Sequence, residues 1–378
     1  MKLTDDQEFF RQTTERFLTE HAAPEELRRL RHDETGYEPH YWRRGAELGW
    51  TSLLVSEAHG GGTISGAGLV DLSLVAYEFG RRAAAGPLIA TNVVAATLSA
   101  HDAHLDVLEG LLSGNSIASW CPPPIPMGAV ATDCRPTVRI TRSGDDVILN
   151  GEVRPVESAP HAAHLLVTGR EDFGLTQVLV PTDVDGLSVV PMETVDLSRR
   201  FGAVTLHDVR LGSDCVIGPP TESSGDVERQ FFQTITLLNA EAVGAMQSGF
   251  DMTMEWMFDR FSFGRPLASY QALKHRCADM LTRLEASHAV SDAACLAAEN
   301  AVPSADELAS AAKAYVGQFG GDLLHECVQL HGGIGITFEH DLHLYLRRFT
   351  VNRSLAGTPA QHRQRIAALL AARPGLAA

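Results

Sequence analysis

Glu241 has the most unusual surroundings of any charged residue in the sequence. It is the only charged residue between Arg229 and Asp251, within the apolar string TLLNAEAVGAMQ. A lone carboxylate in such surroundings costs several kcal/mol to keep ionised unless a cation pairs with it. Desolvation generally raises the pKa of a carboxylate toward the range of a general base. Glu241 is therefore either a catalytic base or the structural partner of an arginine on a neighbouring helix or subunit.

A second group of polar residues lies in Arg260–Pro266 (RFSFGRP), which Tyr270 and Gln271 follow. A guanidinium, a hydroxyl, aromatic rings and an amide gather there at a predicted joint between two helices. The planar guanidinium suits phosphate oxygens, so the segment is a candidate pyrophosphate clamp. The alternative is an ordinary helix end with cations near the negative end of the helix dipole.

A third candidate is Gln329–Gly335 (QLHGGIG), a glycine-rich exit from a predicted helix. Glycine allows the backbone to approach a ligand closely, but it also simply ends helices. Neither this segment nor RFSFGRP indicates a function by itself.

Together, RFSFGRPLASYQALKHRCADM and QLHGGIGITFEHDLHLYLRR resemble the acyl-CoA dehydrogenase family. HYWRRGAELGW, YEFGRR and VDLSRRFGAV extend the resemblance over nearly the whole chain. It is strongest to the actinobacterial and proteobacterial branch with an AExxG helix and an HGGIGxTxEHDLHLYLRR string. It implies a mainly α fold: an N-terminal helical domain (1–117), a small β-barrel or sandwich (118–216) and a C-terminal four-helix bundle (223–378).

The same resemblance implies a FAD-dependent dehydrogenase that oxidises an acyl-CoA thioester to the 2-enoyl-CoA and passes electrons to an electron-transferring flavoprotein. Members of the family assemble as dimers of dimers with FAD between two subunits. Carried over by position, Arg260 contacts the FAD pyrophosphate of the neighbouring subunit. The other implied cofactor contacts are Ser262, Phe263, Gln271, Gln329, Gly333 and Thr358.

The sequence departs from the family at the catalytic base. Family members carry this carboxylate at the position of Ala356 or at that of Thr234, and this chain has it at neither. Glu241 lies seven residues beyond Thr234, about two helical turns along the same face. It is therefore the predicted substitute base. A relocated base suggests an altered cavity for a bulky or branched acyl group, such as a steroid side chain.

The predicted β domain departs as well. CPPPIPMGAVATD replaces the family's TEPxxGSD stretch, and the strand expected beside the flavin reads Val153–Ser158 (VRPVES). Only Ser158 offers a hydroxyl there, so it is the predicted contact. Two alternatives remain: a non-catalytic or half-site subunit of a heteromeric acyl-CoA dehydrogenase, and a flavin-dependent oxygenase on the same fold.

Local patterns predict the elements that position these residues. Thr4–Gln7 reads as a capping box at a helix start, and 303–307 (PSADE) reads as another. Short β-rich runs between turn signals predict an antiparallel sandwich or barrel. The predicted helices cover 39–48, 228–261, 270–299, a segment up to His331 and 359–372. The β-rich runs are 137–141, 147–150, 165–168, 177–180, 187–190 and 204–211.

The amino-acid composition narrows the classes of partner that this protein is expected to bind. The 378 residues carry a formal net charge of −16, and this acidity disfavours nucleic acid or an anionic membrane surface as a partner. The six cysteines form no CxxC pair, so we expect reduced thiols and no metal site. The N-terminus has no signal-peptide pattern. We expect a cytoplasmic enzyme of lipid metabolism, homotetrameric or heterotetrameric, with no membrane span.

Overall fold

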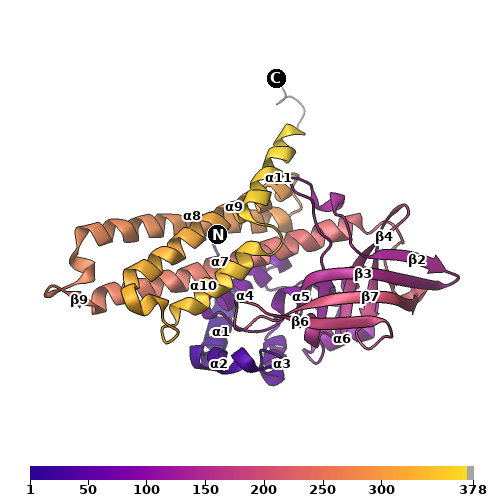
Figure 1. The fold of residues 1–378 in the computed structure, drawn as a ribbon, viewed down its shortest axis with the longest axis horizontal. Coiled ribbons are helices and arrows are strands. Elements are labelled where there is room, and N and C mark those ends of the chain that lie inside the picture. The colour runs from indigo at the N-terminus through magenta and orange to yellow at the C-terminus, as the bar shows by residue number, and fades with distance from the viewer. Residues whose placement is uncertain (373–378) are drawn as a thin grey trace.

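The computed structural model describes residues 1–372, which form helices, then a sheet, then helices again (Figure 1). The predicted capping box at Thr4 is confirmed, because the backbone N–H of Gln7 donates to Thr4 Oγ1 at 3.2 Å. The helices before the sheet are α1 (Asp5–His21), α2 (Pro24–Arg29), α3 (Pro39–Glu47), α4 (Gly68–Arg82), α5 (Leu88–Ala100) and α6 (Leu105–Leu112).

The central sheet is mixed. Its order is β6-β7-β3-β2-β4-β5-β8, and most neighbours are antiparallel as predicted. The β1–β4 and β2–β4 pairings are parallel, which the sequence pattern did not indicate. The strands are β1 (Ala118–Cys121), β2 (Arg139–Ser143), β3 (Asp146–Glu157), β4 (His164–Glu171), β5 (Gly174–Pro181), β6 (Leu187–Met192), β7 (Phe201–Gly212) and β8 (Val216–Ile217).

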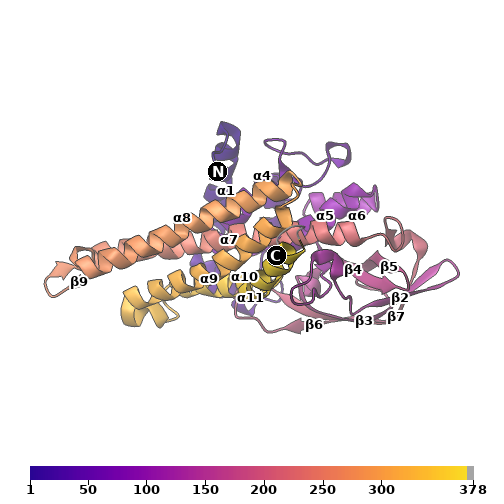
Figure 2. The ribbon, with the colours of Figure 1, turned by 90° about the horizontal axis from the view of Figure 1, so that it is seen from above.

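Five helices follow the sheet. A two-residue turn at Phe263 and Gly264, both with positive φ, joins β9 (Phe261–Ser262) to β10 (Arg265–Pro266) between α7 and α8. Figures 1 and 2 show this hairpin at the end of the bundle remote from the sheet, which we call the bundle tip. The helices are α7 (Ser224–Asp259), α8 (Gln271–Glu299), α9 (Ala305–His331), α10 (Leu342–Ser354) and α11 (Pro359–Ala371).

Two local expectations were wrong or incomplete. Ser304 is the N-cap of α9, but its side chain makes no capping bond, because its backbone (φ −99°, ψ 9°) is not extended as a capping residue requires. Helix α10 was not predicted from periodicity. A 3₁₀ turn (Gly332–Ile336) and a short link precede this helix. The helix begins without a side-chain cap, so no start signal marks it in the sequence.

Helix α7 joins the two halves of the molecule. With 36 residues it is about 54 Å long, and it runs from beside the sheet to the bundle tip (Figure 2). It crosses α4 at two glycines. A Cβ on Gly80 would lie 1.9 Å from the Glu241 carbonyl oxygen, and one on Gly244 would lie 2.0 Å from that of Tyr77. The crossing therefore requires glycine on both helices.

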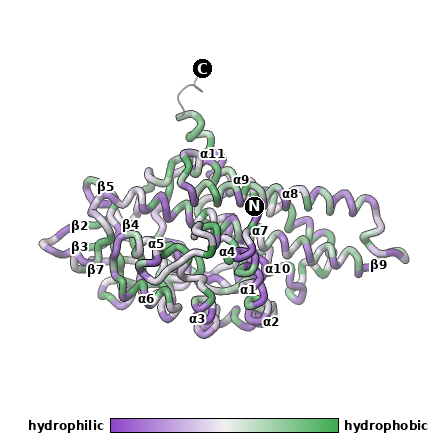
Figure 3. Tube along the Cα trace, turned by 180° about the vertical axis from the view of Figure 1, so that it is seen from behind, coloured by the Kyte–Doolittle hydropathy of each residue, from purple (hydrophilic) through white to green (hydrophobic). Residues whose placement is uncertain are grey.

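The buried apolar side chains form two main clusters. One spans the N-terminal helices, the sheet and the first half of α7, and the other lies within the C-terminal bundle. Hydrophobic and hydrophilic residues alternate along the long bundle helices in Figure 3, as expected for helices with one buried face. No helix within residues 1–372 is both long and apolar enough to cross a membrane.

Candidate active site

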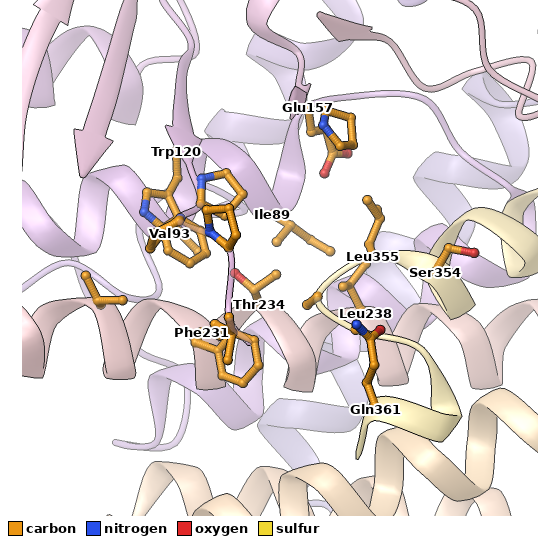
Figure 4. Close-up of a pocket in the computed structure, with 18 of the residues that line it drawn as sticks. Ile89, Val93, Trp120, Glu157, Phe231, Thr234, Leu238, Ser354, Leu355 and Gln361 are labelled. Atoms are coloured by element: carbon orange, nitrogen blue, oxygen red, sulfur yellow. The ribbon is translucent and has the colours of Figure 1, made fainter. Parts of the chain in front are cut away.

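A cavity of about 400 Å³ lies where the sheet domain meets the bundle. Its walls come from α5, the proline-rich segment after β1, the end of β3, the first half of α7, the link between α10 and α11, and α11 itself. In Figure 4, Glu157 enters from the sheet side, whereas Phe231, Thr234 and Leu238 project from α7. Most of the lining is apolar, so the cavity suits a hydrophobic ligand with few polar groups.

Both positions at which the family carries its base line this cavity. Thr234 projects from α7, and its hydroxyl is buried without a hydrogen-bond partner. Ala356 lies in the α10–α11 link with a left-handed backbone, at φ +55°. Neither side chain can remove a proton from a thioester α-carbon. The cavity therefore brings together the two positions that the resemblance assigns to the base, and neither carries a carboxylate.

Glu157 is the only acidic residue among the described residues that line the cavity. It ends β3, and its Oε1 lies 3.2 Å from Arg199 Nε. Burial raises the pKa of Glu157, and the charge of Arg199 opposes that rise. The sequence reasoning missed Glu157, although its place beside Ser158 in the expected flavin-facing strand was a signal.

Glu241 does not line the cavity. Arg348 Nη1 donates to one of its carboxylate oxygens at 2.5 Å. Arg199 Nη2 and Asn352 Nδ2 donate to the other at 2.6 and 2.9 Å. The Glu241 side chain is 4% exposed and is surrounded by donors. The geometry supports the structural interpretation of Glu241, as the partner of arginines distant in sequence, and we do not carry it forward as the base.

The same arginines tie four parts of the fold together. Arg348 also donates to Asp196 at 2.5 Å and to the backbone carbonyls of Ala83 and Ala84. Burial by itself would lower the pKa of Arg348, but the carboxylates of Asp196 and Glu241 raise it overall. Through these contacts the segment before β7 is fixed to α7, to α10 and to the end of α4. Arg199 of VDLSRR and Arg348 of LYLRR are therefore structural cations. Their presence in these two motifs was a signal that the sequence offered.

The bundle tip gathers most of the predicted cofactor residues. Arg260 is exposed at the end of α7, and within residues 1–372 its side chain contacts only the Trp256 ring, 5.8 Å from its centroid. Phe263 is 98% exposed. Trp256 stacks on His331, which brings the ends of α7 and α9 together. The residues at this tip are Arg260, Ser262, Phe263, Gln271, Gln329 and Gly333.

The other two predicted contacts lie elsewhere. Ser158 is buried directly after Glu157, with a left-handed backbone at φ +57°. Thr358 follows the cavity-lining Gly357 and caps α11, where its hydroxyl accepts from the Gln361 amide at 3.4 Å. The structure thus separates the predicted FAD contacts into a group at the bundle tip and a pair beside the cavity.

The chain is similar to known proteins over most of its length. Residues 4–103 match the model of the acyl-CoA dehydrogenase N-terminal domain, and residues 229–371 match that of the C-terminal domain. The chain is 28% identical to acyl-CoA dehydrogenase IpdE2 of Mycolicibacterium smegmatis, over 97% of this chain and 99% of the relative. IpdE2 of Mycobacterium tuberculosis is also 28% identical, over 96% of each chain.

Two similar solved structures are each named for a pair of proteins. One, described as a variant of the Tcur3481-Tcur3483 steroid ACAD, superposes with a TM-score of 0.84 at 28% identity, over 97% of this chain and 98% of that chain. The ChsE4-ChsE5 complex of Mycobacterium tuberculosis superposes with a TM-score of 0.88 at 22% identity, over 99% of each chain, and shows the fold alone. The chain belongs to the acyl-CoA dehydrogenase family, the flavin-dependent oxidoreductases that act on CH–CH bonds.

Proposed function

We propose that the chain is one subunit of a heteromeric acyl-CoA dehydrogenase and that its bundle tip completes the FAD site of a partner subunit, which supplies the catalytic base. One observation carries this proposal. Thr234 and Ala356 occupy both base positions of the chain's own cavity, and Glu241, the substitute expected from the sequence, is held by Arg348 and Arg199. The reaction would be α,β-dehydrogenation of an acyl-CoA, with electrons passed to an electron-transferring flavoprotein.

The bundle tip fits a dinucleotide phosphate. The Arg260 side chain has no hydrogen-bond or ion-pair partner within residues 1–372, so all its N–H donors are available to phosphate oxygens. A Cβ on Gly333 would meet nothing within 4 Å, which leaves its backbone open to close approach. Tyr270 Oη donates to the Ser262 carbonyl at 2.8 Å and fixes the hairpin that carries Phe263.

FAD held at this surface would supply the acceptor for the hydride that leaves the β-carbon of the thioester. The residues of this chain bind and orient rather than transfer protons. Arg260 neutralises phosphate charge, and the exposed ring of Phe263 is buried as the partner docks. An unpaired exposed arginine and an almost fully exposed phenylalanine on one hairpin are expected at a surface that functions only in an assembly.

For an acyl group bound in the cavity of this chain we propose a bulky or branched chain. Apolar side chains make up most of the cavity lining, five of them prolines, and Ala356 and Thr234 are small at the positions of the missing carboxylates. The relative described as a steroid ACAD, at 28% identity, is consistent with this class. Calorimetry on the full chain should therefore show tighter binding of a polycyclic or branched acyl-CoA than of a linear ester of similar mass.

Glu157 favours a second candidate, a homomeric dehydrogenase that uses its own cavity. It is the one carboxylate among the described lining residues, and burial raises its pKa. The ion pair between Glu157 and Arg199 argues against this role. It favours the charged form of Glu157 but also restrains the side chain. The two candidates differ in how much FAD each chain holds.

The test is flavin stoichiometry. The chain would be purified alone and co-expressed with an acyl-CoA dehydrogenase chain from the same genome that carries glutamate at the position of Ala356. We expect little FAD in the chain alone and one FAD for each pair of chains in the complex. Arg260→Met should lower that occupancy at least tenfold, whereas Arg139→Met, an exposed arginine of β2, should not.

The same preparations decide between the candidates. In the complex, acyl-CoA should bleach the flavin at the wild-type rate when Glu157→Gln is introduced. One FAD per chain in the isolated protein, bleached by acyl-CoA and no longer bleached after Glu157→Gln, would replace the heteromeric proposal with the homomeric one.

A further inference from the structure

Arg365 is a buried arginine with no hydrogen-bond or ion-pair partner among the described residues. It lies on α11, lines the cavity and is 3% exposed. Its Nε, Nη1 and Nη2 atoms are all shielded from solvent, and none has a hydrogen-bond partner among the described residues. Asp306 and Glu228 act on its charge only from beyond ion-pair distance, and burial lowers its pKa. Buried arginines are normally paired with an acid.

His362 stands one helical turn before Arg365 and also lines the cavity. Its Nε2–H donates to the Ala356 carbonyl at 2.9 Å, so Nδ1 is an acceptor, and that atom is buried without a partner. Burial lowers the pKa of His362 to about 3, which keeps the ring neutral. The site therefore offers a cationic fork of donors beside one neutral acceptor.

Both side chains pack on Phe231 of α7. The Arg365 guanidinium lies 4.8 Å from the Phe231 ring centroid, and the His362 ring stacks on the same residue with an interplanar angle of 18°. These contacts fix where the two groups point. The five N–H donors of the Arg365 guanidinium lose their hydrogen bonds to water when the side chain is buried. The ring contacts do not replace these bonds, because a ring face offers only one weak electrostatic contact.

We propose that Arg365 binds an oxyanion of a ligand, a carboxylate or a phosphate group, at the α11 end of the cavity, and that His362 Nδ1 accepts a hydrogen bond from a neighbouring N–H or O–H group of the same ligand. A planar guanidinium binds either oxyanion through paired hydrogen bonds. For an acyl-CoA ligand the anion has two possible sources, a phosphate of the CoA portion and a carboxylate carried by the acyl group. This site is separate from the bundle tip, and the inference does not rest on the heteromeric proposal.

The test measures binding by calorimetry on the full chain, in whichever assembly it purifies. The probes are CoA, dephospho-CoA, pentanoyl-CoA and glutaryl-CoA, the last two differing by a terminal carboxylate. We expect Arg365→Met to weaken binding at least tenfold and Arg365→Lys to weaken it less. Arg363→Met, an exposed arginine on the same helix, should leave binding unchanged.

The pattern among the probes identifies the source. A loss confined to glutaryl-CoA assigns the anion to the acyl group, and an equal loss for CoA and both esters assigns it to a CoA phosphate. A loss for CoA but not for dephospho-CoA identifies the 3′-phosphate. Failure of every probe to bind the wild-type chain, or equal binding by wild type and Arg365→Met, would overturn the proposal.

Thermal unfolding of the ligand-free protein provides a readout that does not depend on activity. Because the unpaired charge is unfavourable without ligand, Arg365→Met should unfold at a temperature equal to or above that of the wild type. A markedly lower unfolding temperature together with unchanged probe affinity would show that Arg365 is structural. Flavin occupancy, which tests the proposed assembly, is measured separately, so either proposal can fail alone.

Discussion

Arg348 and Glu241 form an ion pair with 2.5 Å between Nη1 and Oε1, although 107 residues separate them in the sequence. The Arg348 side chain is fully shielded from solvent, and that of Glu241 is 4% exposed. Asp196 is a second carboxylate that binds the Arg348 guanidinium. Burial raises the pKa of Asp196, but the charge of Arg348 lowers it below its ordinary value. The pair thus belongs to a buried network that joins α7, α10 and the segment before β7.

We expect Glu241→Gln to destabilise the fold rather than to remove a base. Losing one charge leaves Arg348 and Arg199 under-compensated in a buried site, which typically costs about 3–5 kcal/mol. Chemical denaturation should show this loss in the free energy of unfolding. Arg29→Met, at an exposed ion pair with Glu26, is the control and should have no measurable effect. Wild-type stability of Glu241→Gln combined with abolished flavin bleaching would restore Glu241 as the base.

Lys313 should make the free energy of unfolding depend on pH between about pH 7 and 10.5. It is buried on α9, donates to the Asn352 carbonyl, and burial lowers its pKa to about 7. Between about pH 7 and its ordinary pKa of 10.5, the unfolded chain binds a proton that the folded chain does not. The free energy of unfolding therefore rises with pH across that window through this group.

Lys313→Met tests that dependence. The variant should unfold at a higher temperature than the wild type at pH 7, and the difference should shrink as the pH approaches 10. Lys274→Met, which changes an exposed lysine of α8, is the control and should follow the wild type at every pH. Parallel stability curves for the wild type and Lys313→Met would contradict the assignment of this titration to Lys313.

The α4–α7 crossing predicts opposite effects for two glycine substitutions. Gly80→Ala places a Cβ 1.9 Å from a backbone oxygen of α7, so the helices must separate. We expect a loss of about 1–3 kcal/mol in the free energy of unfolding, as for other overpacked sites. Gly225→Ala, in the first turn of α7, meets nothing within 4 Å. Because alanine favours helix over glycine, it should be neutral or stabilising by up to about 1 kcal/mol.

Phe263 predicts an effect on assembly without an effect on folding. Its ring is 98% exposed at φ +50° in the hairpin turn. Phe263→Ser should leave the unfolding temperature within a degree or two of the wild type, because no buried contact is lost. Sedimentation should show weaker association of the chain with its partner. Unchanged association would mean that the hairpin does not lie in the interface.

Some features could be predicted because their causes are local. The capping box at Thr4 depends on residues three apart, and glycine after His331 ends α9 with φ +66° at Gly332. Short β-rich runs between turn signals placed most strands to within a few residues. The Ser304 capping box failed because its geometry depends on the preceding turn, and α10 was missed because the chain enters it from a 3₁₀ turn without a capping signal.

By itself, the sequence determined the order of helices, sheet and helices, the family, and the grouping of Arg260 and Phe263 at one joint between two helices, since these follow from short-range patterns. Only the tertiary structure decided what the charges do. Glu241 is isolated along its own helix yet paired in space, and Arg365, an ordinary residue of a polar helix by sequence, is buried without a partner among the described residues. Pairing and burial depend on segments far apart in the chain, and no local pattern records them.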